Sequence, residues 1–72
     1  MTQEVLDNRG LAPPEPMQRT LAKLGELGPD TALVILNDRE PVPLYAELER
    51  RGYAHAAEEL PDGAWRVTIR RP

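Results

Sequence analysis

The side chains that could do chemistry in this 72-residue chain are few, and their types exclude most kinds of catalysis. There is no cysteine, which excludes a thiol nucleophile, a disulfide framework and a thiolate zinc site. His55 is the only histidine, whereas a metal site needs three or four converging ligands. Two pairs of carboxylates have the residue types of acid–base catalysis, but turn and capping roles account for them without a pocket: Asp7 with Glu15, and Asp38 with Glu40. We therefore expect no enzyme, no metal site and no cofactor.

Two arginines lie where an anion could be held. Arg9 and Arg39 follow the first and second predicted strands, where the two helix N-termini should emerge. Helix N-termini attract anions, and a guanidinium can add two parallel hydrogen bonds. Prolines in the first helical turn remove donors, however, and ion pairs with Asp7 and Glu40 would explain the same two arginines. A small anionic ligand at this edge is therefore one of two alternatives.

The charge balance and the apolar pattern argue against nucleic acid and membrane as partners. A net charge of −3 and a pI near 5.0 are unsuited to a phosphate backbone. The longest apolar run, Thr31 to Leu36, is far shorter than the ~20 residues that span a bilayer. The start, Met1 to Glu4, lacks the basic and apolar regions of a signal peptide, so we expect a cytoplasmic protein.

Apolar periodicity predicts the elements that must position these residues. Residues 3–7 alternate polar and apolar positions, which indicates a short strand. A helix should begin at about Pro14, since proline is tolerated in the first helical turn, and should end at Gly28-Pro29. Its apolar stripe recurs at spacings of three and four: Met17, Leu21, Leu24 and Leu27. The continuous run Thr31 to Leu36 predicts a central strand buried on both faces.

The second half of the chain predicts one more helix and a hairpin. The helix should end at Gly52 and carry an ion pair of Glu47 with Arg51 on its outer side. Strands are predicted at residues 53–60 and 64–71, joined by an Asp-Gly turn. In the last strand, alternation places three residues toward the core: Trp65, Val67 and Ile69.

This β-α-β-α-β-β order predicts a single α/β domain over residues 1–72, a two-layer sandwich with a four-stranded mixed sheet. Right-handed crossovers place both helices on one face. The other face should be bare and carry Arg66, Thr68, Arg70 and His55. A core this small stabilises a chain only narrowly, so a homodimer is also consistent with the length.

The segment Leu6 to Pro16 reads Leu-Asp-Asn-Arg-Gly-Leu-Ala-Pro-Pro-Glu-Pro. It resembles the TusA (SirA-like) signature Leu-Asp-x-Arg-Gly-Leu-x-Cys-Pro-x-Pro, which leads into the first helix of those sulfur carriers. The family's sulfur-accepting cysteine falls on Pro13 here. Proline has no nucleophile, so the resemblance implies the fold without the sulfurtransferase activity.

The chain is more similar to a cysteine-less branch of the same superfamily, a domain of unknown function. Members have a Pro-Pro pair at the cysteine position, an Asp-x-x-Pro-x-Pro-Leu segment before helix two and a Trp-Arg-Val-x-Ile last strand. Here these read Pro13-Pro14, Asp38 to Leu44 and Trp65 to Ile69. Members often carry histidines where this chain has Pro16 or Met17 and Arg39, so the resemblance predicts no metal or haem site here.

Two functional hypotheses follow. The first is a non-catalytic interaction module that docks onto a protein partner through residues 9–15 and 38–43, or through the bare sheet face. The second is a protein that binds a small anionic ligand at Arg9 and Arg39. The candidate binding residues are Arg9, Pro13, Pro14, Glu15, Asp38 and Arg39.

Overall fold

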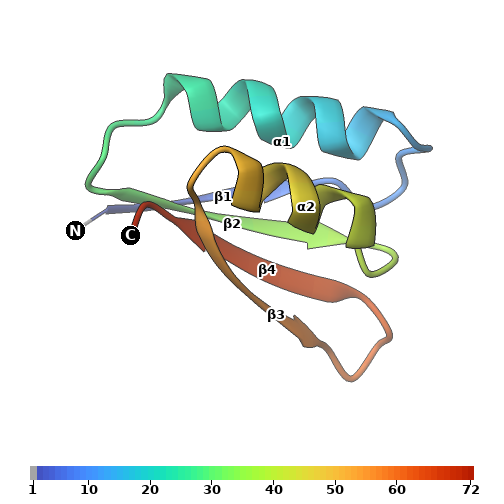
Figure 1. Ribbon diagram of the computed structural model, residues 1–72. Coiled ribbons are helices and arrows are strands. Elements are labelled where there is room, and N and C mark those ends of the chain that lie inside the picture. Colours follow the sequence, from blue (N-terminus) through green and yellow to red (C-terminus); the bar gives the residue numbers. More distant parts are fainter. Residues whose placement is uncertain (1) are drawn as a thin grey trace.

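The computed structural model describes residues 2–72 and shows a four-stranded sheet with two helices on one face (Figure 1). The elements are β1 (Thr2–Asp7), α1 (Glu15–Glu26), β2 (Thr31–Asn37), α2 (Val42–Arg50), β3 (Ala54–Glu59) and β4 (Trp65–Arg70). Their spatial order is β1-β2-β4-β3, with β1 parallel to β2 and β4 antiparallel to both of its neighbours. The predicted mixed sheet and two-layer sandwich are confirmed.

The core lies between the helices and the covered face of the sheet. The apolar run in β2 places Leu33 and Ile35 there, and the alternation in β4 adds Val67 and Ile69. The helical stripes contribute Leu24, Leu44 and Leu48. Because so few side chains form the core, each accounts for a large share of the apolar surface that folding removes from water.

Both helices begin with prolines, and their N-termini emerge at the same end of the sheet. Pro14 and Pro41 precede α1 and α2, and each first turn contains a further proline, whose missing N–H leaves no helical hydrogen bond unmade. Since β1 and β2 are parallel, their carboxyl ends lie together, opposite the end where β1 begins and β4 finishes (Figure 1). Within residues 2–72, neither helix is long and apolar enough to cross a membrane.

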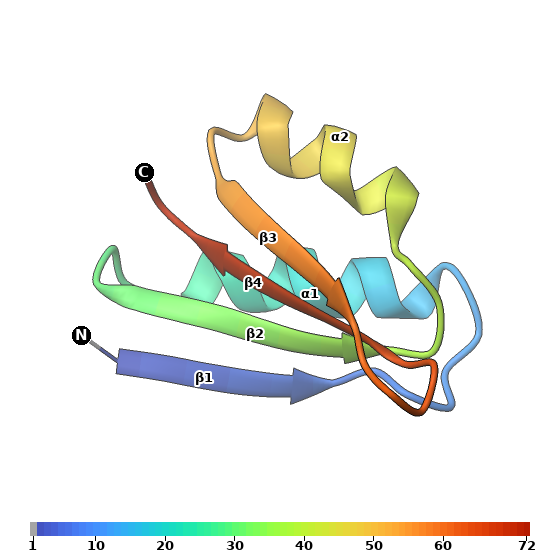
Figure 2. The same cartoon turned by 90° about the horizontal axis from the view of Figure 1, so that it is seen from below.

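The second face of the sheet carries no helix (Figure 2). Val5, Val34 and Thr68 occupy adjacent positions across β1, β2 and β4 on this face. Arg66 and Arg70 lie there too, as predicted, because the alternate residues Val67 and Ile69 point into the core. Arg66 forms an ion pair with Glu58 of β3, so part of its charge is already compensated.

The prediction that His55 lies on the bare face is wrong. His55 pairs across the ladder with Ile69, a core residue, so its side chain belongs to the helix-covered face. Its ring stacks on Tyr45 of α2, with ring centroids 4.6 Å apart and planes within 8°. The imidazole therefore lies on the helix-covered face of β3 and packs against α2.

Candidate functional site

A pocket of about 710 Å³, open to solvent, lies between the loops that lead into the two helices. One wall comes from residues 10–14, 16 and 17, the other from residues 37–41, 43 and 44, and Asn8 completes the lining. Much of the wall is apolar, including Leu11, Met17, Leu44 and five of the chain's eight prolines: Pro13, Pro14, Pro16, Pro41 and Pro43. Proline rings have fixed φ angles, so these walls keep their shape without an occupant.

Buried polar side chains from three elements meet beside the pocket. Asn8 follows β1, Asn37 ends β2 and Thr20 belongs to α1; they are 1%, 7% and 0% exposed. The Asn8 Nδ2 donates to Thr20 Oγ1 at 3.1 Å and to Asn37 Oδ1 at 3.2 Å, with a longer contact of 3.4 Å to the carbonyl oxygen of Pro16. The Thr20 hydroxyl donates to the same Pro16 carbonyl at 2.8 Å. This network holds the carboxyl ends of β1 and β2 against the start of α1.

One atom of this network has no partner. The Asn8 Oδ1 is buried and accepts no hydrogen bond from residues 2–72, although Asn8 lines the pocket. Leaving such an acceptor unpaired costs about 1–3 kcal/mol, so buried polar atoms are almost always satisfied. No group within residues 2–72 supplies the hydrogen-bond donor that this oxygen requires.

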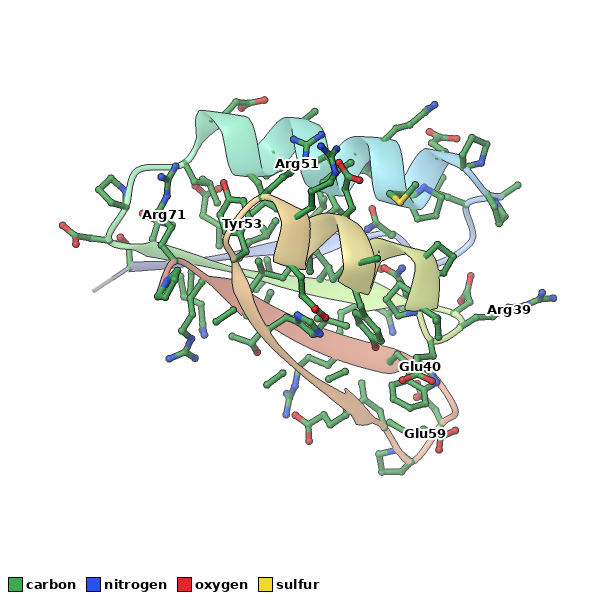
Figure 3. The ribbon with its side chains drawn as sticks, viewed as in Figure 1. Arg39, Glu40, Arg51, Tyr53, Glu59 and Arg71 are labelled. Atoms are coloured by element: carbon green, nitrogen blue, oxygen red, sulfur yellow. The ribbon has the colours of Figure 1, made fainter. Side chains whose placement is uncertain are left out.

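The rim of the pocket carries more negative than positive charge. Asp38, Arg39 and Glu40 line it, which gives two carboxylates and one guanidinium. The Asp38 Oδ2 accepts a 2.7 Å hydrogen bond from the Gly10 backbone N–H and so joins the two loops. Gly10 has a φ of 84°, a conformation that favours glycine. Figure 3 shows Arg39 extending away from the ribbon at this end.

Glu40 is engaged with α2 at the same rim. The Tyr45 hydroxyl donates to Glu40 Oε2 at 3.3 Å. Burial of the phenol, together with the nearby Glu40 carboxylate, raises the pKa of Tyr45 to about 12. Glu40 is therefore held beside Tyr45, and no ion pair joins it to Arg39 within residues 2–72.

Arg9 is bound to Asp7 and does not line the pocket. Its Nε donates to Asp7 Oδ1 at 2.9 Å and its Nη2 to Asp7 Oδ2 at 2.8 Å, a bidentate pair. The Arg9 backbone N–H donates to the same carboxylate at 3.0 Å, and Arg19 donates to the Asp7 carbonyl at 3.2 Å. The hydrogen bonds from the Arg9 side chain lower the pKa of Asp7 to about 2.

The low pKa of Asp7 predicts a stability change in acid. The folded pKa of about 2 lies below the ordinary value of 3.8, so the stability from this pair is complete above about pH 4 and is lost as pH falls through about 2. Asp7→Asn should therefore have a lower melting temperature than the parent at pH 6, and the difference should shrink toward pH 2. Thermal unfolding by circular dichroism measures it. A difference that does not change over this range would contradict the assignment.

The structure brings most of the predicted site residues together. Pro13, Pro14, Asp38 and Arg39 line the pocket. Glu15 lies outside it, in a shallower hollow on the outer side of α1 that it shares with the two prolines. Arg9 lies outside both. Among residues 2–72 no three His, Cys, Asp or Glu side chains gather as metal ligands do.

The sequence interpretation missed the buried polar network. No buried role was predicted for Asn8, Asn37 or Thr20. Thr20 does stand at helical spacing from both Met17 and Leu24, and so on the buried face of α1. A polar residue within an apolar stripe is a sign of a buried partner, and this signal was present in the sequence.

Comparison with known proteins gives a consistent result. A solved structure of the SirA-like protein from Desulfitobacterium hafniense is similar, with a TM-score of 0.83 and 29% identity, over 92% of this chain and 93% of that one. No curated protein matches the chain. A family described as "Uncharacterized conserved protein (DUF2249)" matches residues 5–71. The chain therefore belongs to the DUF2249 family, and its fold is SirA-like, as the signature after β1 predicted.

Proposed function

We propose that this protein is a non-catalytic binding module that captures an apolar side chain of a partner protein in the pocket between residues 10–17 and 37–44. The observation that carries the proposal is the proline-lined pocket at the edge where the two helices begin. Its walls are preorganised, so little conformational entropy is lost when a partner binds.

The surface around the pocket supports a protein partner. Val42 is 57% exposed and lies between Pro41 and Pro43 at the start of α2. Ala12, Pro13 and Pro14 are exposed on the opposite wall. Apolar surface around a pocket with a charged rim is typical of protein-binding sites, where an anchor side chain enters the hollow and its neighbours exclude water.

The bare sheet face is a weaker candidate. Val5 is 64% exposed there, but Val34 beside it is 7% exposed, and Arg66 with Glu58 forms an exposed ion pair on the same face. The pocket and the shallower hollow beside it both lie at the start of α1 and not on that face. We therefore place the partner at the helix N-termini.

A small anionic ligand remains the alternative prediction, with less support from the geometry. Arg9 is paired with Asp7 through two side-chain hydrogen bonds, and two of the three charged residues on the pocket rim are carboxylates. Titration of the ¹⁵N-labelled protein with inorganic phosphate tests it. We expect no shift of the amide signals at residues 10–17, whereas saturable shifts there would favour the anionic ligand.

Selection from a phage-displayed library of random linear peptides tests the proposed function. We expect the recovered peptides to share an aromatic or large aliphatic residue and to bind Leu11→Gln about tenfold more weakly than the parent, since Leu11 forms part of the apolar wall. Val5→Gln makes the same kind of change on the bare face and should leave the affinity unaltered. Recovery of no binding peptide, or a loss of affinity with Val5→Gln instead, would contradict the proposal.

A further inference from the structure

We infer that Asn8 selects the occupant of the pocket, by accepting a hydrogen bond at its side-chain oxygen from an N–H or O–H group on an aromatic side chain of the partner, with tryptophan the best match. The inference rests on the proposed function, because it names the chemistry of the group that the pocket takes. The observation behind it is the buried Asn8 Oδ1, which accepts no hydrogen bond from residues 2–72 and belongs to a residue that lines the pocket.

The surrounding network fixes which end of the Asn8 amide is the acceptor. Its Nδ2 faces three oxygens: Pro16 O, Thr20 Oγ1 and Asn37 Oδ1. If the amide were rotated by half a turn, its oxygen would face the Pro16 carbonyl oxygen, which cannot donate. It would also face the Thr20 hydroxyl, whose hydrogen is already donated to Pro16. The unpaired atom of Asn8 is therefore its side-chain oxygen, and its hydrogen-bond partner must be a donor on the occupant of the pocket.

The walls and the rim narrow the class of occupant. The apolar proline rings and the side chains of Leu11 and Met17 suit the face of an aromatic ring. The rim has one more negative than positive charge, from Asp38 and Glu40 against Arg39, which disfavours an anionic group. Tryptophan and tyrosine combine an apolar ring with one donor, and the indole N–H only donates.

The occupant must displace a neighbouring side chain to reach the oxygen, which is shielded from solvent in the unoccupied protein. Met17 lies on the pocket wall and is half-buried. Its unbranched side chain has three rotatable bonds and adapts to new neighbours more readily than the rigid prolines around it. We therefore assign the opening movement to Met17.

Amide chemical-shift titrations with indole and 1-methylindole test the inference, because the two probes share the ring and only indole has the N–H. We expect both to shift the signals of residues 10–17 and 38–44, and indole to bind at least about fivefold more tightly. In Asn8→Leu this preference should disappear, since leucine has nearly the same shape and no acceptor. Thr68→Val, on the bare face, should keep it.

The possible failures are distinguishable. Equal binding of the two probes to the parent protein would overturn the role of Asn8 and leave the proposed function standing. If Asn8→Leu still bound indole more tightly than 1-methylindole, the role of Asn8 would be overturned as well. If neither probe shifts the pocket signals, both the inference and the aromatic occupant are contradicted. The comparison of probes on the parent protein holds even if Asn8→Leu does not fold.

Discussion

Leu48→Ala is expected to destabilise the domain by about 2–5 kcal/mol, the usual cost of truncating a fully buried leucine. Leu48 has no exposed surface and packs in the core cluster with residues of β2 and β4. A chain of this length has a total stability of about 4–11 kcal/mol, so the loss is a large fraction of the whole. The melting temperature should fall by about 10 °C or more. Urea unfolding followed by Trp65 fluorescence measures the change.

Val42→Ala is the matched control, because it removes apolar atoms from the same helix at a position that is 57% exposed. Its effect should stay within about 0.5 kcal/mol, as for most surface substitutions. A cost below about 1 kcal/mol for Leu48→Ala would show that α2 does not pack on the sheet as described.

Asn8→Asp is expected to destabilise the protein by about 3 kcal/mol or more at neutral pH, although it replaces only the side-chain NH₂ group with an oxygen. The new carboxylate would be buried and would face the oxygens of Pro16 and Asn37 without their donor. Desolvation should raise the pKa of this carboxyl in the folded state above its unfolded value. The variant should therefore be most stable below about pH 4 and should lose stability as pH rises.

The pH dependence of the free energy of unfolding distinguishes the cost of the buried carboxylate from the cost of the lost hydrogen bonds. Asn8→Leu also lacks the amide donor but introduces no charge, so its stability relative to the parent should not change between about pH 4 and 7. Urea unfolding of both variants across this range gives the comparison. If Asn8→Asp matched Asn8→Leu at every pH, the Asn8 side chain would not be buried in the way described.

Much of the fold could be predicted because its signals are local. The continuous apolar run at Thr31 to Leu36 and the alternation in β4 fixed two central strands, and prolines marked both helix starts. The pairing of Glu47 with Arg51 also followed from helical spacing and is present at 2.9 Å. The face of β3 was harder, because Ala-His-Ala-Ala-Glu-Glu has no apolar alternation to assign its sides. His55 was misplaced for that reason.

The candidate site was predicted in position but not in chemistry. The turn residues after β1 and β2 indicated the right edge, since parallel strands bring their carboxyl ends together. The hydrogen bond between Asn8 and Asn37 joins residues 29 positions apart, and no local sequence pattern predicts it. For Arg9 the sequence left two alternatives, an anion site and an ion pair with Asp7, and the structure shows the ion pair, with two side-chain hydrogen bonds.

The cysteine of the TusA signature corresponds to Pro13 here, and Pro13 is a residue of the pocket wall. This edge therefore presents proline rings and side-chain amides, and the chain has no thiol. A binding role at this edge needs no reactive side chain. It needs only a preformed apolar hollow and a polar atom that discriminates between occupants.

The most direct test of the pocket as the binding site is to locate a bound probe by nuclear Overhauser contacts from the ring protons of indole to the protein. We predict contacts with Leu11 and Met17 on one wall and with Pro43 on the other. Contacts with Val5, Val34 or Leu36 of the bare sheet face, and none with the pocket walls, would contradict the account.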